Sequence, residues 1–129
     1  MRASVEAFFK KYVKAWDSFD ADSIATFYRL PCAISDSDGV RTYSDAAELR
    51  KKFEKNYNDM YGFGYKSARF NILNQSNLSQ DQVAITVGWR IKTETQKLEF
   101  RTLYICHLLN DAWLIVSANI YPESFEDIS

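Results

Sequence analysis

One side chain that could transfer protons is the single histidine of this sequence, His107. It lies in the apolar run LYICHLL at residues 103–109, where an imidazole can act as a general base or as a proton shuttle. A histidine in such a run can equally be a structural or interface residue. No partner cluster of ligating side chains accompanies it. We therefore expect neither a metal ion nor a cofactor.

The two cysteines, Cys32 and Cys106, are too few for a disulfide scaffold or a zinc cluster. Cys106 is flanked by apolar residues, so we expect a small buried hydrophobic side chain rather than a nucleophile. Nucleophile-elbow and dinucleotide-binding motifs do not occur, and Gly62-Phe63-Gly64 lacks the context of a phosphate loop. The sequence thus indicates neither nucleophilic nor nucleotide-dependent chemistry.

The unusual feature of the composition is its aromatic content of 16% in 129 residues. This length suits one domain with a real core, over residues 1–129. The 16 basic and 17 acidic side chains leave a net charge of -1, which provides no field to attract nucleic acid or an anionic membrane. Since neither a membrane span nor a signal-peptide core is present in the sequence, a cytoplasmic location is expected.

Helical periodicity of the apolar residues dominates the first half of the chain. The first helix is predicted over residues 5–16, with the stripe Val5, Phe8, Phe9, Tyr12, Val13 and Trp16. A second helix is predicted between an N-cap at Asp20 and Pro31, with Ile24, Phe27 and Tyr28 on its apolar side. After a small hairpin at residues 32–43, a third helix begins at Ser44 and carries the stripe Leu49, Phe53, Tyr57 and Met60.

The second half of the chain has the period of extended strands. Strands are predicted over residues 65–74, 83–92, 99–109 and 112–121, and the short turns between them require an antiparallel meander. The last two strands contain nearly continuous apolar runs, so both faces of that part of the sheet must be covered. Helices can cover one face only, and a homodimer through the other face of the sheet is the expected explanation.

The turn at Asn110-Asp111 decides which side chains of the last two strands share a face. A two-residue turn gives the pairs Thr102 with Asn119, Tyr104 with Ser117, and Phe100 with Tyr121. This polar and aromatic row is predicted to line a pocket. His107 then lies on the outer face, in a row with Leu103, Ile105, Val116, Ala118 and Ile120. A one-residue change in the turn reverses the assignment.

The order helix, helix, hairpin, helix and four long strands resembles the NTF2-like (cystatin-like α+β) superfamily, which includes ketosteroid isomerases, SnoaL-like proteins and scytalone dehydratase. The resemblance covers residues 3 to 122 and is carried by fragments such as YVKAWDSFDADSIATFY and NDAWLIV. It implies an α+β cone in which three N-terminal helices pack on a strongly curved, mainly antiparallel sheet of about six strands. It also implies a largely apolar pocket inside the cone, while the reaction varies from member to member.

Two residues match catalytic positions of the ketosteroid isomerases. Tyr12 resembles the tyrosine that hydrogen-bonds a developing enolate, and Asp36 resembles the aspartate that moves the proton. The chain departs from that pattern because residues 102–105 contain no carboxylic acid; Tyr104 or Thr102 is the available replacement. The alternative interpretation makes Tyr12 a core residue and Asp36 a cap of the Asp-Ser-Asp-Gly turn.

The fold implied by the resemblance brings aromatic residues from several elements around one cone. These are Trp16, Tyr57, Tyr61, Trp89, Tyr104, Trp113 and Tyr121. We expect ligand-binding roles for Trp16, Tyr57, Trp89, Thr102, Tyr104, Asn119 and Tyr121. The ligand would be a small apolar or aromatic organic molecule, on which Asp36 and Tyr12 could act in an isomerase-, cyclase- or dehydratase-like proton transfer. The alternative is a non-catalytic dimerisation or protein-interaction module whose rings fill the cone as core.

Overall fold

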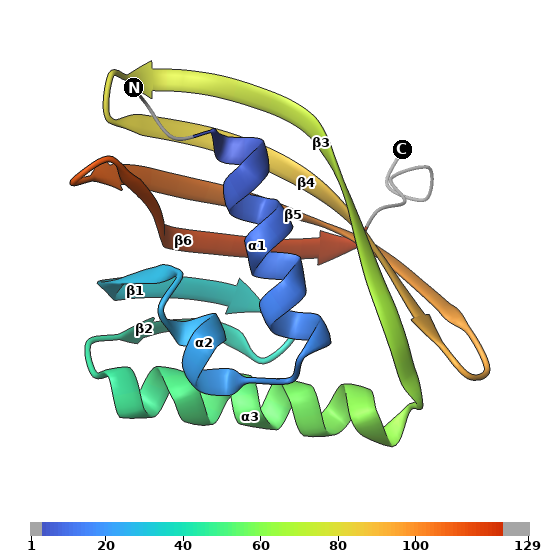
Figure 1. The fold of residues 1–129 in the computed structure, drawn as a ribbon. Helices are drawn as coiled ribbons and strands as arrows, with labels where there is room; N and C mark the ends of the chain where they lie inside the picture. The colour runs from blue at the N-terminus through green and yellow to red at the C-terminus, as the bar shows by residue number, and fades with distance from the viewer. Residues whose placement is uncertain (1–3, 123–129) are drawn as a thin grey trace.

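Within residues 4–122, which the computed structural model describes, three helices pack against one six-stranded sheet (Figure 1). The elements, in chain order, are α1 (Val5–Asp17), α2 (Ala21–Ala25), β1 (Tyr28–Asp36), β2 (Gly39–Tyr43), α3 (Ala46–Gly62), β3 (Tyr65–Ser79), β4 (Gln82–Thr93), β5 (Lys97–Leu109) and β6 (Ala112–Pro122). The predicted α+β class is confirmed.

The first and third predicted helices are confirmed as α1 and α3, although α3 begins at Ala46 after the cap Asp45 rather than at Ser44. Each begins at a side-chain cap: the Ser4 hydroxyl accepts from the Ala7 N–H at 3.3 Å, and the Asp45 carboxylate accepts from the Ala47 N–H at 2.8 Å. The second helix is shorter than predicted, because only five residues of α2 are helical. No helix among the described residues is long and apolar enough to cross a membrane.

The prediction that Phe27 and Tyr28 belong to the second helix is wrong. Tyr28 is the first residue of β1, where it is buried and pairs with Ile115 of β6. A five-residue helix cannot be stabilised by its own hydrogen bonds, and the pairing with β6 offers the following residues a complete backbone partner. The chain therefore leaves the helix early enough for Tyr28 to point toward α1.

The strand order of the sheet is β2-β1-β6-β5-β4-β3. The predicted four-stranded meander is confirmed as β3 to β6, and all neighbouring strands are antiparallel except β1 and β6, which are parallel. Strands β3, β4 and β5 bend strongly along their length, and α1 lies across the face of the sheet inside this bend (Figure 1). The helices and the bent strands thus enclose the interior from both sides.

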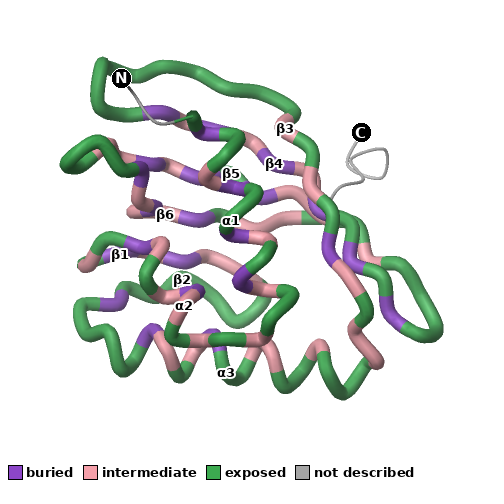
Figure 2. Tube along the Cα trace, viewed as in Figure 1, coloured by how far each residue is buried: buried purple, intermediate pink, exposed green. Residues whose placement is uncertain are grey.

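The core lies between α1 and the inner face of the sheet. Alternate residues of β4 are buried, as its period-2 pattern predicts: Val83, Ile85, Val87, Trp89 and Ile91. Phe9 of α1 is fully buried, and its ring lies 4.9 Å from that of Tyr104 on β5. Figure 2 shows this alternation of buried and more exposed residues along the central strands. One face of the sheet is therefore committed to packing against the helices.

A β-bulge at Val116 corrects the predicted register of the last two strands. The two-residue turn at Asn110-Asp111 is confirmed, with both residues at positive φ (51° and 64°), and pairing follows the prediction to Cys106 with Ile115. Beyond it, Ile105 pairs with Ser117, so one residue of β6 is extra. The bulge reverses the face of every later residue in β6.

The corrected register gives the pairs Tyr104 with Ala118, Thr102 with Ile120, and Phe100 with Pro122. Ala118 and Ile120 therefore face inward, whereas Asn119 and Tyr121 share the outer face with Leu103. His107 precedes the bulge on β5 and lies two and four residues from Ile105 and Leu103 along the strand, on this same outer face.

Candidate functional site: an aromatic cavity inside the cone

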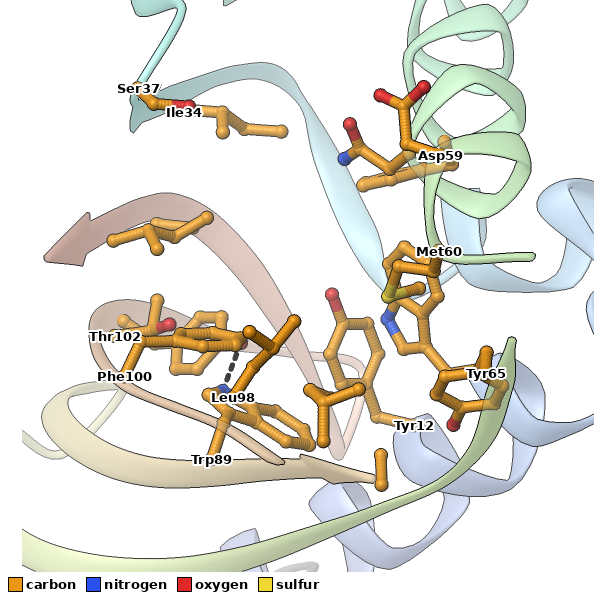
Figure 3. A pocket seen from close by; sticks show the side chains of 18 of the residues that line it. Tyr12, Ile34, Ser37, Asp59, Met60, Tyr65, Trp89, Leu98, Phe100 and Thr102 are labelled. Carbon is orange, nitrogen blue, oxygen red and sulfur yellow. Dashed lines mark hydrogen bonds between the residues drawn. The ribbon is translucent and has the colours of Figure 1, made fainter. Parts of the chain in front are cut away.

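A cavity of about 340 Å³ lies between α1, α3 and the inner face of the sheet. Its aromatic lining is Tyr12, Trp16, Tyr28, Phe53, Tyr65, Trp89, Phe100 and Tyr104. Its aliphatic and sulfur-containing lining is Ile34, Met60, Ala68, Ile91, Leu98, Ala118 and Ile120. Its polar lining is Ser37, Asn56, Asp59 and Thr102. Figure 3 shows Tyr12 of α1, Met60 of α3, Trp89 of β4 and Thr102 of β5 around the same space.

Two buried hydrogen bonds join aromatic residues of the lining. The hydroxyls of Tyr12 and Tyr28 are 2.7 Å apart. The indole Nε1–H of Trp89 donates to the Tyr104 hydroxyl at 3.1 Å, the bond that is dashed in Figure 3. Burial raises the pKa of all three phenols, strongly for Tyr28 and Tyr104. These phenols therefore stay protonated and can act as hydrogen-bond donors throughout the physiological pH range.

Thr102 carries a polar atom in the lining that lacks a hydrogen-bond partner. Its side chain is buried, with 1% of the residue exposed, and its Oγ1 makes no hydrogen bond within the described residues. The hydroxyl lies near enough to Tyr104, two residues along β5, to affect the pKa of that phenol, but outside hydrogen-bond geometry. An unpaired buried hydroxyl costs about 1–3 kcal/mol, so this one is an unusual feature of the interior.

The opening of the cavity is marked by the lining residues that remain exposed, Ser37 and Asp59. The Asp59 carboxylate is 3.3 Å from the Lys55 ammonium at the surface of α3. Farther along the wall, the Tyr65 hydroxyl donates to the Asp17 carboxylate at 2.6 Å, and burial followed by this hydrogen bond raises the pKa of the Tyr65 phenol. The charged groups are thus at the rim, and the interior is apolar apart from its hydroxyls, the two indoles and the Asn56 amide.

The structure brings most of the expected ligand-binding residues together. Five of the residues named from the sequence line the cavity: Tyr12, Trp16, Trp89, Thr102 and Tyr104. Asn119 and Tyr121 do not, because the Val116 bulge turns them to the outer face. Of the other aromatic residues considered for the cone, Tyr61 is exposed and Trp113 is buried in the core away from the lining.

Tyr57 also lies outside the cavity lining. The face of α3 that lines the cavity carries Phe53, Asn56 and Met60, at spacings of three and four residues. Tyr57 is rotated away from this face and packs against Phe19 in the α1–α2 connection, with ring centroids 4.1 Å apart. Its role is therefore to fix that connection on α3.

Asp36 is held by an ion pair outside the cavity lining. Its Oδ2 is 2.5 Å from the Lys52 ammonium, and its Oδ1 accepts from the Asp38 N–H at 2.9 Å. These contacts anchor the β1–β2 turn to α3, as the turn-cap interpretation requires. The neighbouring Ser37 is the residue of this turn that reaches the cavity.

Sequence reasoning missed several lining residues, notably Tyr28 and Phe53 as partners of one cavity, whereas Phe100 was in the row predicted to line a pocket. Tyr28 was not recognised as a lining residue because it had been assigned to a helix. Leu30, which precedes Pro31, prefers an extended backbone, and this preference was a signal that a strand begins nearby. Phe53 was identified only as a core residue of its helix. The Phe53 ring lies 5.1 Å from the Tyr28 ring, so Phe53 is both a core residue and a residue of the cavity lining.

The remaining reactive side chains do not join the cavity. Cys32 and Cys106 are free and buried, and burial raises the pKa of their thiols to about 11 and about 12. Within the described part of the chain, no group of three or more His, Cys, Asp or Glu side chains could hold a metal ion. His107 lies on the outer face of β5 and is not among the lining residues.

A bent six-stranded sheet closed by helices around an aromatic cavity defines the NTF2-like class of α+β proteins, as the sequence resemblance predicted. The chain belongs to the family described as NTF2-like protein (DUF6841), whose model matches residues 3–123. A comparison with curated proteins found no match.

Solved structures share the fold at low sequence identity. An NTF-2 like protein of unknown function from Shewanella oneidensis has a TM-score of 0.74 and 19% identity, covering 90% of this chain and 94% of that one. A candidate calcium/calmodulin-dependent protein kinase type II association domain from Thiobacillus denitrificans has a TM-score of 0.75 and 12% sequence identity. The match covers 96% of this chain and 98% of that one. A ketosteroid isomerase-like protein from Erwinia carotovora atroseptica has a TM-score of 0.70 and 10% sequence identity. The match covers 94% of this chain and 95% of that one. At these identities the likeness concerns the fold alone.

Proposed function

We propose that the protein binds a small, largely apolar organic molecule inside the cone. The observation that supports this proposal is the cavity of about 340 Å³ with eight aromatic residues in its lining. This volume is within the range of about 300–1,000 Å³ that is typical of small-molecule sites. Flat rings favour a flat ligand, because offset and edge-to-face contacts between rings add to the burial of apolar surface.

Binding, rather than proton transfer by Asp36, is the function that the geometry favours. The Asp36 carboxylate is occupied by Lys52 and by the Asp38 N–H, and Asp36 is absent from the described lining. The lining carboxylate, Asp59, is exposed and paired with Lys55 at the rim. Tyr12 keeps its proposed role as a hydrogen-bonding phenol, since its hydroxyl is buried in the cavity wall.

Filling the cavity is expected to abolish ligand binding. Ala118 of β6 is buried in the lining, so Ala118→Phe places a ring in the space that a ligand would occupy. We expect the wild-type protein to bind tetralin, a small apolar bicyclic probe, and the variant to bind it at least about tenfold more weakly, the equivalent of about 1.4 kcal/mol. Quenching of tryptophan fluorescence reports binding, because Trp16 and Trp89 line the cavity.

The matched control for this experiment is Ala47→Phe, at an exposed position of α3, which should bind tetralin like the wild type. Ala68→Leu, on the β3 wall of the cavity, is a second filling variant in case Ala118→Phe fails to fold. Absence of binding to the wild-type protein, or equal binding by folded filling variants, would contradict the proposed function.

We further propose that the protein is a homodimer through the outer face of the sheet. Apolar side chains on this face are left partly exposed, including Leu103, of which 36% is exposed, Ile105 two residues along β5, and Leu114 opposite His107. The structural neighbour named as a candidate association domain gives this proposal a precedent in the fold. The same face contains His107, which the dimer would place at an interface.

Leu103→Glu is expected to convert the dimer into a monomer, because paired copies would bury two uncompensated carboxylates. Val40→Glu, at a residue that is 76% exposed on β2, is the control and should leave the mass unchanged. Sedimentation equilibrium at micromolar concentration measures the mass of each variant. A monomeric wild-type protein would overturn the dimer proposal.

A further inference from the structure

We propose that the ligand carries an uncharged carbonyl group that enters first and is bound by the hydroxyls of Thr102 and Tyr104, with the apolar remainder of the ligand toward the rim. This inference rests on the proposed ligand binding and specifies its chemistry. It is based on two buried hydroxyl groups in one part of the cavity wall, which offer more hydrogen-bond donors than the wall has acceptors for. The two hydroxyls lie two residues apart on β5, so they project from the same face of the strand into the same space.

Tyr104 has a proton to donate. Its oxygen accepts the indole proton of Trp89 at 3.1 Å, and its own O–H makes no hydrogen bond of ordinary length within the described residues, since the neighbouring Tyr12 hydroxyl is bonded to Tyr28 at 2.7 Å. Burial holds the phenol in its protonated form, because it raises the pKa of Tyr104 well above its usual value. Tyr104 is thus a fixed donor on the inner wall, with its ring held against Phe9 and its hydroxyl oriented by Trp89.

Thr102 supplies the second, independent observation. Its hydroxyl is buried in the lining and makes no hydrogen bond within the described residues. Buried hydroxyls normally have a partner. The other buried threonine of the sheet shows this: the Thr93 hydroxyl donates to the Gln96 carbonyl at 2.9 Å and accepts from the Gln96 N–H at 3.0 Å. Thr102 therefore has an unused donor where Thr93 does not.

The group that satisfies both donors is an acceptor oxygen with two lone pairs, as in a ketone or quinone carbonyl. A carboxylate would also accept two hydrogen bonds, but the described lining contains no lysine, arginine or histidine to compensate a buried negative charge. An ammonium group would find no carboxylate away from the rim, where Asp59 lies. The wall at Thr102 and Tyr104 thus favours a neutral acceptor.

The test compares two probes of nearly equal shape, 1-tetralone and tetralin, which differ by one carbonyl oxygen. We expect the wild-type protein to bind 1-tetralone about tenfold more tightly than tetralin, because the carbonyl completes hydrogen bonds that are otherwise unmade. In Thr102→Val, which removes the hydroxyl at nearly constant shape, this preference should fall to about threefold or less. Because the preference is the ratio of the two affinities within one protein, a change in tetralin binding that Thr102→Val causes by its altered surface is cancelled in the comparison.

The matched control is Thr93→Val, the same substitution at a threonine whose hydroxyl is paired. It should leave the preference for 1-tetralone unchanged. Without ligand, Thr102→Val should raise Tm by about 2–4 °C, since it removes an unpaired buried hydroxyl, whereas Thr93→Val should lower it. Tyr104→Phe is a second test of the preference, although it also leaves the Trp89 indole N–H without its acceptor and so lowers Tm.

The outcomes separate this inference from the proposed function. If neither probe binds, the proposed function fails and the inference with it. If both probes bind the wild type equally, or if Thr102→Val retains the full preference, ligand binding stands and the carbonyl assignment is overturned. A Tm loss in Thr102→Val as large as that in Thr93→Val would show that the Thr102 hydroxyl has a partner in the free protein, and would also overturn it.

Discussion

Replacing Phe9 by alanine is expected to lower the free energy of unfolding by about 3–5 kcal/mol, the usual cost of removing a fully buried phenylalanine. Phe9 has no exposed surface and is surrounded by rings: its centroid lies 5.1 Å from Phe8, 6.0 Å from Tyr12, 6.3 Å from Phe70 and 4.9 Å from Tyr104. These neighbours come from α1, β3 and β5, so they cannot collapse together into the vacated space. Urea denaturation measures the change.

The matched control is Phe63→Ala, the same substitution at a residue that is 57% exposed at the end of α3. Its effect should be within about 0.5 kcal/mol. Phe9→Ala should also weaken the binding of tetralin, because Tyr12 and Tyr104 line the cavity and lose the ring that holds them in place. A loss below about 1 kcal/mol in Phe9→Ala would contradict the packing described for the cone.

Removing Lys52 is expected to have the second largest effect. In Lys52→Met, the Asp36 carboxylate loses its ion-pair partner in a site where the two side chains are 9% and 14% exposed. Removing one partner of a fully buried ion pair lowers the free energy of unfolding by about 3–5 kcal/mol. Because both side chains keep some contact with water, we expect Lys52→Met to lower it by about 2 kcal/mol. Asp36→Asn should cost less, because the Lys52 ammonium keeps the more distant Asp38 carboxylate at 3.8 Å.

The double variant Asp36→Asn with Lys52→Met separates the ion pair from other effects. Its loss of unfolding free energy should be smaller than the sum of the losses in the two single variants, because the double variant leaves neither charge unpaired. Lys55→Met is the control: Lys55 pairs with Asp38 and Asp59 at the surface, where such contacts contribute about 0.2–1 kcal/mol. Strict additivity in the urea-denaturation cycle would show that Asp36 and Lys52 do not interact.

The parts of the fold predicted best from the sequence are those determined by local periodicity. Apolar residues recur at the helical period from Val5 to Trp16 and at every second position of β4. Side chains with these spacings lie on one face of their element, so the pattern indicates which face is buried. Tyr28 shows the limit. Its place in β1 depends on pairing with Ile115, nearly 90 residues away, a partner that no local pattern reveals.

The candidate site was predicted well on one wall and poorly on the other. Strand alternation puts Thr102 and Tyr104 on one face, the resemblance adds Trp89 to the same cone, and all three are in the lining. Asn119 depended on counting residues from a turn, and a single extra residue at Val116 reversed its face. Bulges have no reliable signature in one sequence, because the extra residue keeps an ordinary side chain and affects only the pairing.

The position of β6 has a consequence for how the protein folds. This strand lies between β1 and β5 in the sheet, so it connects the β1–β2 hairpin to the meander, yet it is the last of the six strands to leave the ribosome. Until it emerges, the first hairpin has no strand to join, and the parallel pairing must then close a loop of about 80 residues. The cone is therefore completed only after all six strands have emerged, and its ligand site forms in the same step.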